Sequence, residues 1–189
     1  MGELHVIFAT TLDMFVADSA GGLGWIIMGD DRANYMVESL APDRTDTLML
    51  GRKTYQSFAA GWPVLARDPN ASEVERYIGQ RFDAMRKVVY STTMKTAGWP
   101  GTEIVSSIEP DEVRRLKAES ENCIRLDGSI SIVQQMTKLG LIDEYRLMVH
   151  PVALGSGRPL FDGPVDLKLT GSEELGSGVV VLTYRRAAE

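Results

Sequence analysis

The chain contains a single cysteine, Cys123, among its 189 residues. One cysteine excludes an intramolecular disulfide and a zinc cluster built from several thiolates, so we expect a small, buried, hydrophobic side chain here. The two histidines, His5 and His150, both lie in apolar runs. An imidazole in such a run is more often a hydrogen-bonded strand residue than a ligand. The sequence therefore predicts no metal site.

Positive charge is also scarce, since the formal net charge is −6 and the pI is about 5.0. Proteins that bind nucleic acids usually present a basic surface, which this composition does not favour. The amino-terminal sequence lacks the basic and apolar segments of a signal peptide. No apolar run reaches the roughly 18 residues that span a bilayer. We therefore expect a cytoplasmic protein that binds neither nucleic acid nor membrane and acts on a small molecule.

Apolar, β-branched segments alternate with segments of helical periodicity along the chain. We expect strands at residues 4–10, 45–51, 87–93, 103–108, 122–129, 143–154, 165–175 and 178–186. We expect helices at 30–40, 52–62, 109–120 and 131–142, a helical turn within 71–82, and loops at 11–25 and 155–163. This order predicts one α/β domain over residues 1–189, with a mostly parallel sheet and an antiparallel hairpin at its C-terminal edge.

Two details of these elements carry further expectations. Pro151 falls inside the predicted strand 143–154, which indicates an edge strand or a bulge. Asp30 or Asp31 is expected to cap the first helix, because an aspartate side chain accepts hydrogen bonds from the first N–H groups of a helix.

Small, hydroxyl or cationic residues follow three of the predicted strands. Gly51 is followed by Arg52, Lys53 and Thr54, and the strands ending VVY and RLDG run into STT and SIS. In open α/β sheets, ligands bind outside the carboxyl ends of the strands, where helix N-termini offer unpaired N–H groups and partial positive charge. The pattern predicts a site for an extended, phosphorylated ligand. It is neither a Walker A loop nor the GxGxxG of the common dinucleotide fold.

Several segments together carry a family resemblance: TLDMFVAD, LMLGRKTY, KVVYSTT, LDGSISIVQQM and GLIDEYRLMVHPVALGSGRPLF. Their order resembles the dihydrofolate reductase-like family, and more closely its branch near the RibD C-terminal (reductase) domain of bacterial riboflavin biosynthesis. The resemblance covers nearly the whole chain and is weakest over residues 62–84. It implies a three-layer α/β/α fold, NADPH lying across the strand ends, and a homodimer, with the strand near residues 145–154 as an edge that makes the contact.

The resemblance also implies which residues hold the adenosine half of NADPH. Arg52, Lys53 and Thr54 would bind phosphates, with Arg52 facing the 2′-phosphate. Ser91 and Thr92 would contact the adenosine. Gly51 would let the backbone approach a phosphate closely.

The rest of the cofactor would lie further along the strand ends. The resemblance implies that the pyrophosphate is cradled at a helix start by Gly128, Ser129, Ile130 and Ser131. Ala9 and Val16 would flank the nicotinamide in a pocket that excludes water.

The substrate residues are less sharply defined. In dihydrofolate reductases a tryptophan is followed five residues later by an acid that binds the pterin, and Trp25 and Asp30 have this spacing here. The Asp30 carboxylate would either bind and help protonate a heterocycle or only cap a helix. Trp25 is either a substrate residue or core. Tyr55 and Phe58 either line the substrate pocket or pack in the interior.

The sequence departs from the family pattern at two places. Met14 replaces a loop glycine, and Asp127-Gly128 replaces the paired glycines of dihydrofolate reductases. The zinc signature of a deaminase is absent, so the chain is not the bifunctional riboflavin enzyme.

Four functions stay open. The first is an NADPH-dependent reductase of a small pterin- or pyrimidine-like heterocycle. The second is a true dihydrofolate reductase. The third is the 5-amino-6-(5-phosphoribosylamino)uracil reductase, with Arg158 near the substrate phosphate. The fourth is a non-catalytic nucleotide-binding protein.

Overall fold

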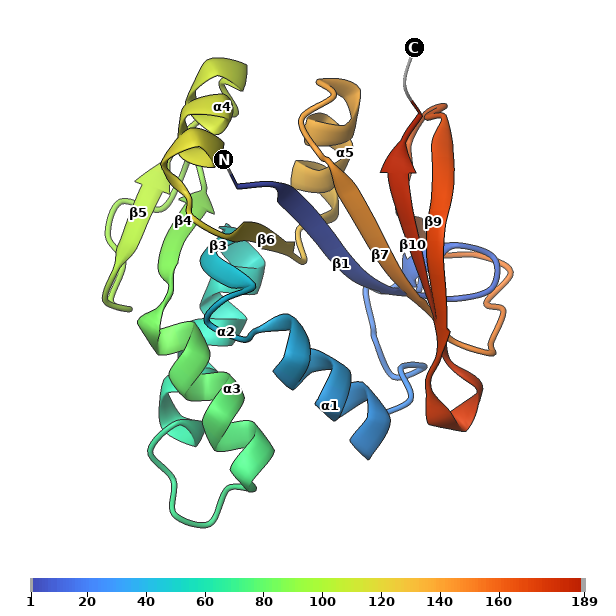
Figure 1. Ribbon diagram of the computed structural model, residues 1–189, viewed down its shortest axis with the longest axis horizontal. Helices are drawn as coiled ribbons and strands as arrows, with labels where there is room; N and C mark the ends of the chain where they lie inside the picture. The colour runs from blue at the N-terminus through green and yellow to red at the C-terminus, as the bar shows by residue number, and fades with distance from the viewer. Residues whose placement is uncertain (1, 188–189) are drawn as a thin grey trace.

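The computed structural model describes residues 2–187 and contains one large sheet of eight strands (Figure 1). The first six strands in the order below run parallel, and the last two are antiparallel to their neighbours. Across the sheet the order is β5 (Thr102–Val105), β4 (Arg86–Tyr90), β3 (Thr45–Gly51), β6 (Cys123–Asp127), β1 (Leu4–Thr10), β7 (Glu144–Val149), β10 (Val180–Arg186) and β9 (Leu167–Glu174). The predicted mostly parallel sheet with a C-terminal antiparallel hairpin is confirmed.

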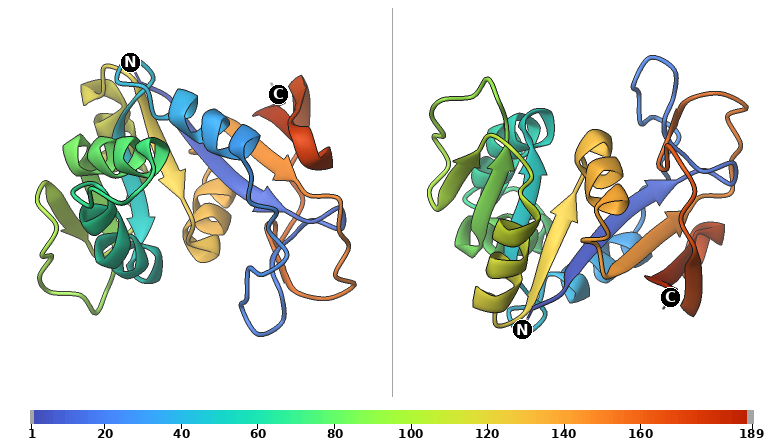
Figure 2. Two further views of the ribbon diagram at one scale, coloured as in Figure 1. Left: turned by 90° about the horizontal axis from the view of Figure 1, so that it is seen from below. Right: turned by 90° about the horizontal axis from the view of Figure 1, so that it is seen from above.

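Helices cover both faces of this sheet, as the two views in Figure 2 show. One face carries α1 (Asp30–Ser39), α2 (Arg52–Leu65) and α3 (Glu73–Ala84). The other face carries α4 (Pro110–Glu119) and α5 (Ile130–Lys138). This arrangement confirms the three-layer α/β/α fold. None of the helices within residues 2–187 is both long enough and apolar enough to cross a membrane.

The central strand β3 shows why the sheet forms from this sequence. Its residues Leu48, Met49 and Leu50 are all fully buried. Leu48 and Leu50 pack into the core beneath α1, α2 and α3, whereas Met49 packs into the core beneath α4 and α5. Successive side chains of a strand point to opposite faces, so a strand covered by helices on both faces must be apolar throughout.

The strand predicted over residues 143–154 is shorter and differently placed than expected. It ends at Val149, so Pro151 lies beyond β7 and interrupts no ladder hydrogen bond. β7 is also not an edge strand, because it pairs with β1 on one side and β10 on the other. The prediction that this strand makes the dimer contact as an edge is therefore wrong. The two edges of the sheet are β5 and β9.

Two helix starts also differ from the expectation. The predicted helical turn within 71–82 is the full helix α3, whose Ser72 side chain accepts from the Glu75 N–H at 3.2 Å while the Glu75 carboxylate accepts from the Ser72 N–H at 2.9 Å. This reciprocal capping box stabilises the first turn. Conversely, α1 is preceded by Gly29, and neither Asp30 nor Asp31 makes a side-chain cap.

The predicted loops 11–25 and 155–163 contain a short ladder that the sequence did not reveal. Strand β2 (Phe15–Ala17) pairs antiparallel with β8 (Arg158–Pro159). Strands of two and three residues have too few side chains to show a period of two. A single 3₁₀ turn, η1 (Gly176–Gly178), joins β9 to β10.

Candidate active site

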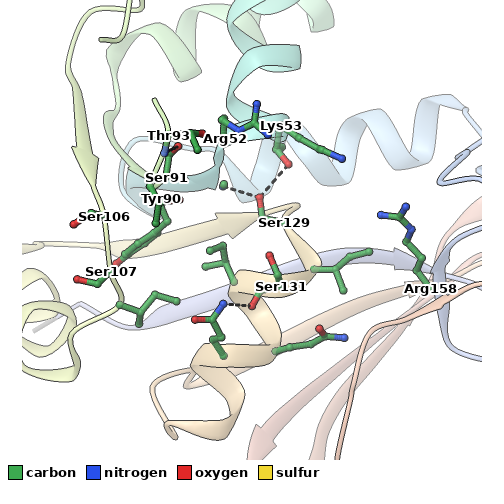
Figure 3. Close-up of a pocket in the computed structure, with 18 of the residues that line it drawn as sticks. Arg52, Lys53, Tyr90, Ser91, Thr93, Ser106, Ser107, Ser129, Ser131 and Arg158 are labelled. Atoms are coloured by element: carbon green, nitrogen blue, oxygen red, sulfur yellow. Dashed lines mark hydrogen bonds between the residues drawn. The ribbon is translucent and has the colours of Figure 1, made fainter. Parts of the chain in front are cut away.

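The carboxyl ends of β3, β4, β5 and β6 open into a groove with a volume of about 870 Å³. Figure 3 shows Ser91, Ser106 and Ser107 at one end of the groove, Ser129 and Ser131 in the middle, and Arg158 at the other end. The groove is lined by the strand ends and the residues that follow them: Gly51, Arg52, Lys53 and Thr54 at the end of β3, Ser91, Thr92 and Thr93 after β4, Ser106 and Ser107 after β5, and Ser129, Ile130 and Ser131 after β6.

Most of the predicted cofactor residues therefore lie together in the groove. The exceptions are Ala9, Val16 and Gly128, which line a neighbouring inner cavity instead. Sequence reasoning missed two hydroxyl residues of the groove, Ser106 and Ser107, because the predicted strand 103–108 included them. The observed strand ends at Val105, so both residues lie past the strand end, and Thr93 of the predicted STT segment also lines the groove.

Hydrogen bonds join the turn after β6 to the end of β3 and the start of α2. The Ser129 hydroxyl accepts from the Gly51 N–H at 2.6 Å and lies 3.2 Å from the Thr54 hydroxyl. Gly128 has a φ of +65°, and a Cβ atom there would lie 2.5 Å from the Thr54 hydroxyl oxygen. Only glycine allows both this backbone conformation and this close approach. The turn after β6 is thus held against the start of α2.

The charges around the groove favour an anionic ligand. Helices α2 and α5 begin at the groove, and neither carries an acidic residue in its first turn. The other three helices, α1, α3 and α4, each carry two acidic residues there. An uncompensated helix N-terminus offers N–H groups and partial positive charge to phosphates. Arg52, Lys53 and Arg158 add full positive charges to the lining.

An inner cavity of about 720 Å³ adjoins the groove. The two share lining residues, namely Lys53, Thr54, Ser129, Ile130 and Arg158. One wall of the inner cavity is an aromatic cluster from α2 and α3, in which the Phe58 and Trp62 rings each lie 5.3 Å from the Phe82 ring. This wall makes the space beside the groove largely apolar on that side.

Charged groups lie at the polar side of this cavity. The Arg125 guanidinium donates to the Asp127 carboxylate at 2.7 Å and to the Ser39 hydroxyl at 2.7 Å, and the two charged side chains are only 2% and 9% exposed. Arg32 also lines the cavity, and its buried Nε has no partner among the described residues. Burial lowers the pKa of the Arg32 guanidinium.

The sequence held a signal for this buried pair. Arg125 and Asp127 are two residues apart in an otherwise apolar strand, so their side chains share a face of the sheet. The Asp127 carboxylate lines the inner cavity and not the groove. The replacement of a family glycine by Asp127 therefore brings no negative charge into the groove.

The predicted substrate residues lie in different parts of the structure. Phe58 lines the inner cavity. The Tyr55 hydroxyl accepts from the Trp99 N–H at 3.0 Å, within a different cavity on the outside of α2. Trp25 packs edge-on against His150, with ring centroids 5.4 Å apart. Asp30 is exposed at the start of α1. The side of α1 that lines the inner cavity carries Arg32, Ala33 and Met36 instead. Trp25 and Asp30 therefore line neither the groove nor the inner cavity.

Met14 adopts a backbone conformation that is typical of glycine. Met14 has a φ of +63°, in the left-handed region that favours glycine. The Asp13 carboxylate beside it accepts from the Thr11 hydroxyl at 2.5 Å and from the Gly155 N–H at 2.7 Å. The Thr11 hydrogen bond is the main cause that lowers the pKa of Asp13. These contacts fix the loop between β1 and β2 against the chain that leads to Arg158.

Comparison with known proteins identifies the family. Residues 3–181 match the RibD C-terminal domain family. The chain is 32% identical over 179 residues to YyaP of Bacillus subtilis (strain 168), which covers 93% of this chain and 90% of YyaP. It is 28% identical over 186 residues to YwjB of the same organism, which covers 95% of each chain. The chain belongs to the RibD C-terminal domain family, a family of reductase domains, and the predicted resemblance is confirmed.

Solved structures share the fold over the whole chain. A putative riboflavin biosynthesis protein from Shewanella sp. PV-4 superposes with a TM-score of 0.70 at 25% identity, covering 98% of this chain and 99% of that one. A pyrimidine reductase-like protein from Corynebacterium diphtheriae gives 0.69 at 16% identity, covering 100% and 93%. RibD of Acinetobacter baumannii gives 0.67 at 15% identity, and the match covers 99% of this chain but 58% of that protein.

Proposed function

We propose that the protein is an NADPH-dependent reductase that transfers hydride to a small pterin- or pyrimidine-like heterocycle. The observation that carries this proposal is the cationic, hydroxyl-lined groove that opens onto a largely apolar inner cavity. A hydride transfer needs this arrangement, with a long anionic cofactor beside a compact site for the acceptor ring. Family membership and the similarity to a pyrimidine reductase-like protein support the same class of reaction.

The residues of the groove fit NADPH. Arg52 is exposed at the start of α2, where its guanidinium is free to pair with the 2′-phosphate. The first N–H groups of α2 and α5 suit the pyrophosphate. Ala9 and Val16 line the inner cavity, where the nicotinamide would have to enter to meet a substrate. When bound, NADPH supplies the hydride.

The inner cavity would orient the acceptor. Its aromatic wall packs against a flat ring, while the Asp127 carboxylate, fixed by Arg125, accepts a hydrogen bond from a ring N–H. We therefore assign to Asp127 the substrate-binding role that the sequence predicted for Asp30. Phe58 remains a substrate residue in this proposal, and Trp25 and Tyr55 become supporting residues.

A titration with NADPH and with NADH, followed by nicotinamide fluorescence, tests the cofactor site. The wild type should bind NADPH more tightly than NADH, and Arg52→Ala should lose that preference. Arg114→Ala, which removes an exposed arginine of α4 far from the lining residues, is the matched control and should keep it. Failure of the wild type to bind either nucleotide would overturn the proposal.

The 5-amino-6-(5-phosphoribosylamino)uracil reductase is a second candidate, favoured by two cations. Arg158 lies where the groove meets the inner cavity, and Arg32 presents a buried Nε without a partner among the described residues. Both could bind a substrate phosphate. Rates of NADPH oxidation with this compound and with its dephosphorylated form distinguish the candidates. A rate that does not depend on the phosphate would exclude the second.

The other two functions are tested by the same assay. Strong inhibition by an antifolate would favour a true dihydrofolate reductase, although Asp30 lies outside the inner cavity. Steady NADPH oxidation with any heterocycle would exclude a non-catalytic nucleotide-binding protein.

We also propose a cytoplasmic homodimer, on the basis of family resemblance. The contact would use a free edge of the sheet, β5 or β9, rather than β7. Light scattering on the purified protein should give twice the chain mass of 20.8 kDa. A mass of one chain at micromolar concentration would refute the dimer.

A further inference from the structure

A second polar cluster lies at the opposite, amino ends of the strands. There a cavity of about 460 Å³ is lined by Glu3, His5 and Cys123, among other residues. Only Ile7 and Arg125 line both this cavity and the inner cavity of the active site. The cluster is therefore a separate site that opens to a different part of the surface.

Strand register brings the cluster together. His5 on β1 pairs with Glu144 on β7, and Leu4 pairs with Ile124 on β6. Cys123, one residue before Ile124, thus lies beside Glu3 and on the same face of the sheet as His5. His5 and Cys123 are 118 residues apart in the sequence. The sequence predicted no metal site, and a contact between such distant residues cannot be read from local sequence.

The distances within the cluster match a metal site. His5 Nε2 lies 3.0 Å from Glu3 Oε2 and 3.6 Å from Cys123 Sγ. Zinc–nitrogen and zinc–sulfur bonds of about 2.05 and 2.3 Å at a tetrahedral angle place N and S about 3.5 Å apart. Imidazole nitrogen, carboxylate oxygen and thiolate sulfur are all ligands that Zn²⁺ accepts. Glu3, His5 and Glu144 also each place a ligand atom within 4.8 Å of the others.

A second carboxylate lies behind the imidazole. Glu144 Oε1 is 3.6 Å from His5 Nδ1, the ring nitrogen that does not contact Glu3 or Cys123, and it accepts from Arg146 Nε at 2.6 Å. Histidines that bind metals usually direct their other ring nitrogen at such a carboxylate, which fixes the tautomer and the ring orientation.

Arg185 also orders the cluster. It binds Glu3 through Oε1, which leaves Oε2 directed at His5, and it binds Glu144 at 3.2 Å. Arg146 and Arg185 also repel a cation, so the affinity should be weaker than in sites built from thiolates alone.

We propose that Glu3, His5 and Cys123 bind one Zn²⁺ ion, with water from the cavity as fourth ligand and Glu144 orienting His5. On binding, the Cys123 thiol releases one proton to solvent. The imidazole binds through Nε2 and carries its proton on Nδ1, facing Glu144. This site is independent of the proposed reductase activity. Because the ion displaces the thiol proton, zinc affinity should increase with pH.

The test is a competition between the tag-free protein and a chromophoric chelator of micromolar zinc affinity. The wild type should bind one zinc ion per chain, and Cys123→Ser and His5→Ala should weaken binding more than a hundredfold. Glu144→Gln should weaken it about tenfold, the usual effect of removing an outer carboxylate. Glu121→Gln is the matched control, because Glu121 lines the same cavity outside the cluster, and it should bind like the wild type.

A second readout identifies the ligands directly. With Co²⁺ in place of Zn²⁺, the wild type should show thiolate-to-cobalt charge-transfer absorption that Cys123→Ser lacks. Circular dichroism of each metal-free variant establishes that it is folded. Absence of zinc binding by the wild type, or equal binding by folded Cys123→Ser and His5→Ala, would overturn the proposal.

Discussion

Replacing Arg125 with methionine should cost the protein a large part of its stability. The Arg125 side chain is 2% exposed, and it donates to Asp127, to the Ser39 hydroxyl and to the Met36 sulfur. Methionine fills similar space without charge, so the Asp127 carboxylate would stay buried with no partner. Removing one member of a buried ion pair costs about 3–5 kcal/mol. We expect a loss of this size in the free energy of unfolding.

Urea unfolding followed by tryptophan fluorescence measures this change. The double variant Arg125→Met/Asp127→Asn should recover part of the loss, because its buried amide carries no charge. Arg114→Met, at an exposed arginine of α4, should change stability by less than about 0.5 kcal/mol. A loss below about 1 kcal/mol for Arg125→Met, or a double variant no more stable than the single one, would refute the reasoning.

Three further predictions follow from local features. Ser72→Ala removes the capping box of α3 and should lower the unfolding free energy by about 1 kcal/mol in the same urea assay. Gly128→Ala places a Cβ against Thr54 at a φ of +65°, where a non-glycine residue costs about 1–2 kcal/mol, so NADPH binding measured by fluorescence should weaken about tenfold or more. Lys87 is fully buried, and burial lowers its pKa from 10.5 to about 8. Between these pH values the folded protein binds fewer protons than the unfolded chain, so the stability of the wild type relative to Lys87→Met should rise from pH 8 to pH 10.

Each of these predictions has a matched control. Ser72→Asn retains a capping side chain and should keep most of the stability. Gly98→Ala adds a Cβ with no atom within 4 Å and should leave NADPH binding unchanged. Equal stability of Ser72→Ala and wild type, or equal NADPH affinity of the two alanine variants, would contradict the structural explanation. For Lys87, parallel stability profiles of the wild type and the methionine variant between pH 8 and 10 would do so.

The sequence predicted the sheet and the groove well for a physical reason. Strands buried on both faces are largely apolar, as in residues 45–51. Where such a run is followed by glycine, cationic and hydroxyl residues, the pattern predicts a ligand site at the carboxyl end of the strand. The prediction of strands failed where a strand is too short to show alternation of apolar and polar residues, or where its end was misplaced. The β2–β8 ladder is too short to show alternation, and Ser106 and Ser107 were absorbed into a strand that ends at Val105.

The sequence could not place the residues whose role depends on which elements become neighbours. Asp30 has the expected spacing from Trp25, yet the orientation of α1 turns Arg32 and not Asp30 to the inner cavity. The edge position expected for residues 145–154 failed because β10 pairs with the outer side of β7. Neither outcome can be read from local periodicity, since both depend on contacts between distant segments.

By itself the sequence determined the α/β class, the alternation of strands and helices that gives a mostly parallel sheet, the family, and the positions of the groove-lining loops. Local patterns of apolar, glycine and hydroxyl residues specify these features over windows of a few residues. Only the tertiary structure decided that the Arg125–Asp127 pair lines the inner cavity, and that Glu3, His5 and Cys123 meet at the other end of the sheet. Strand register sets the contact between His5 and Cys123, and register is fixed by the packing of the whole sheet.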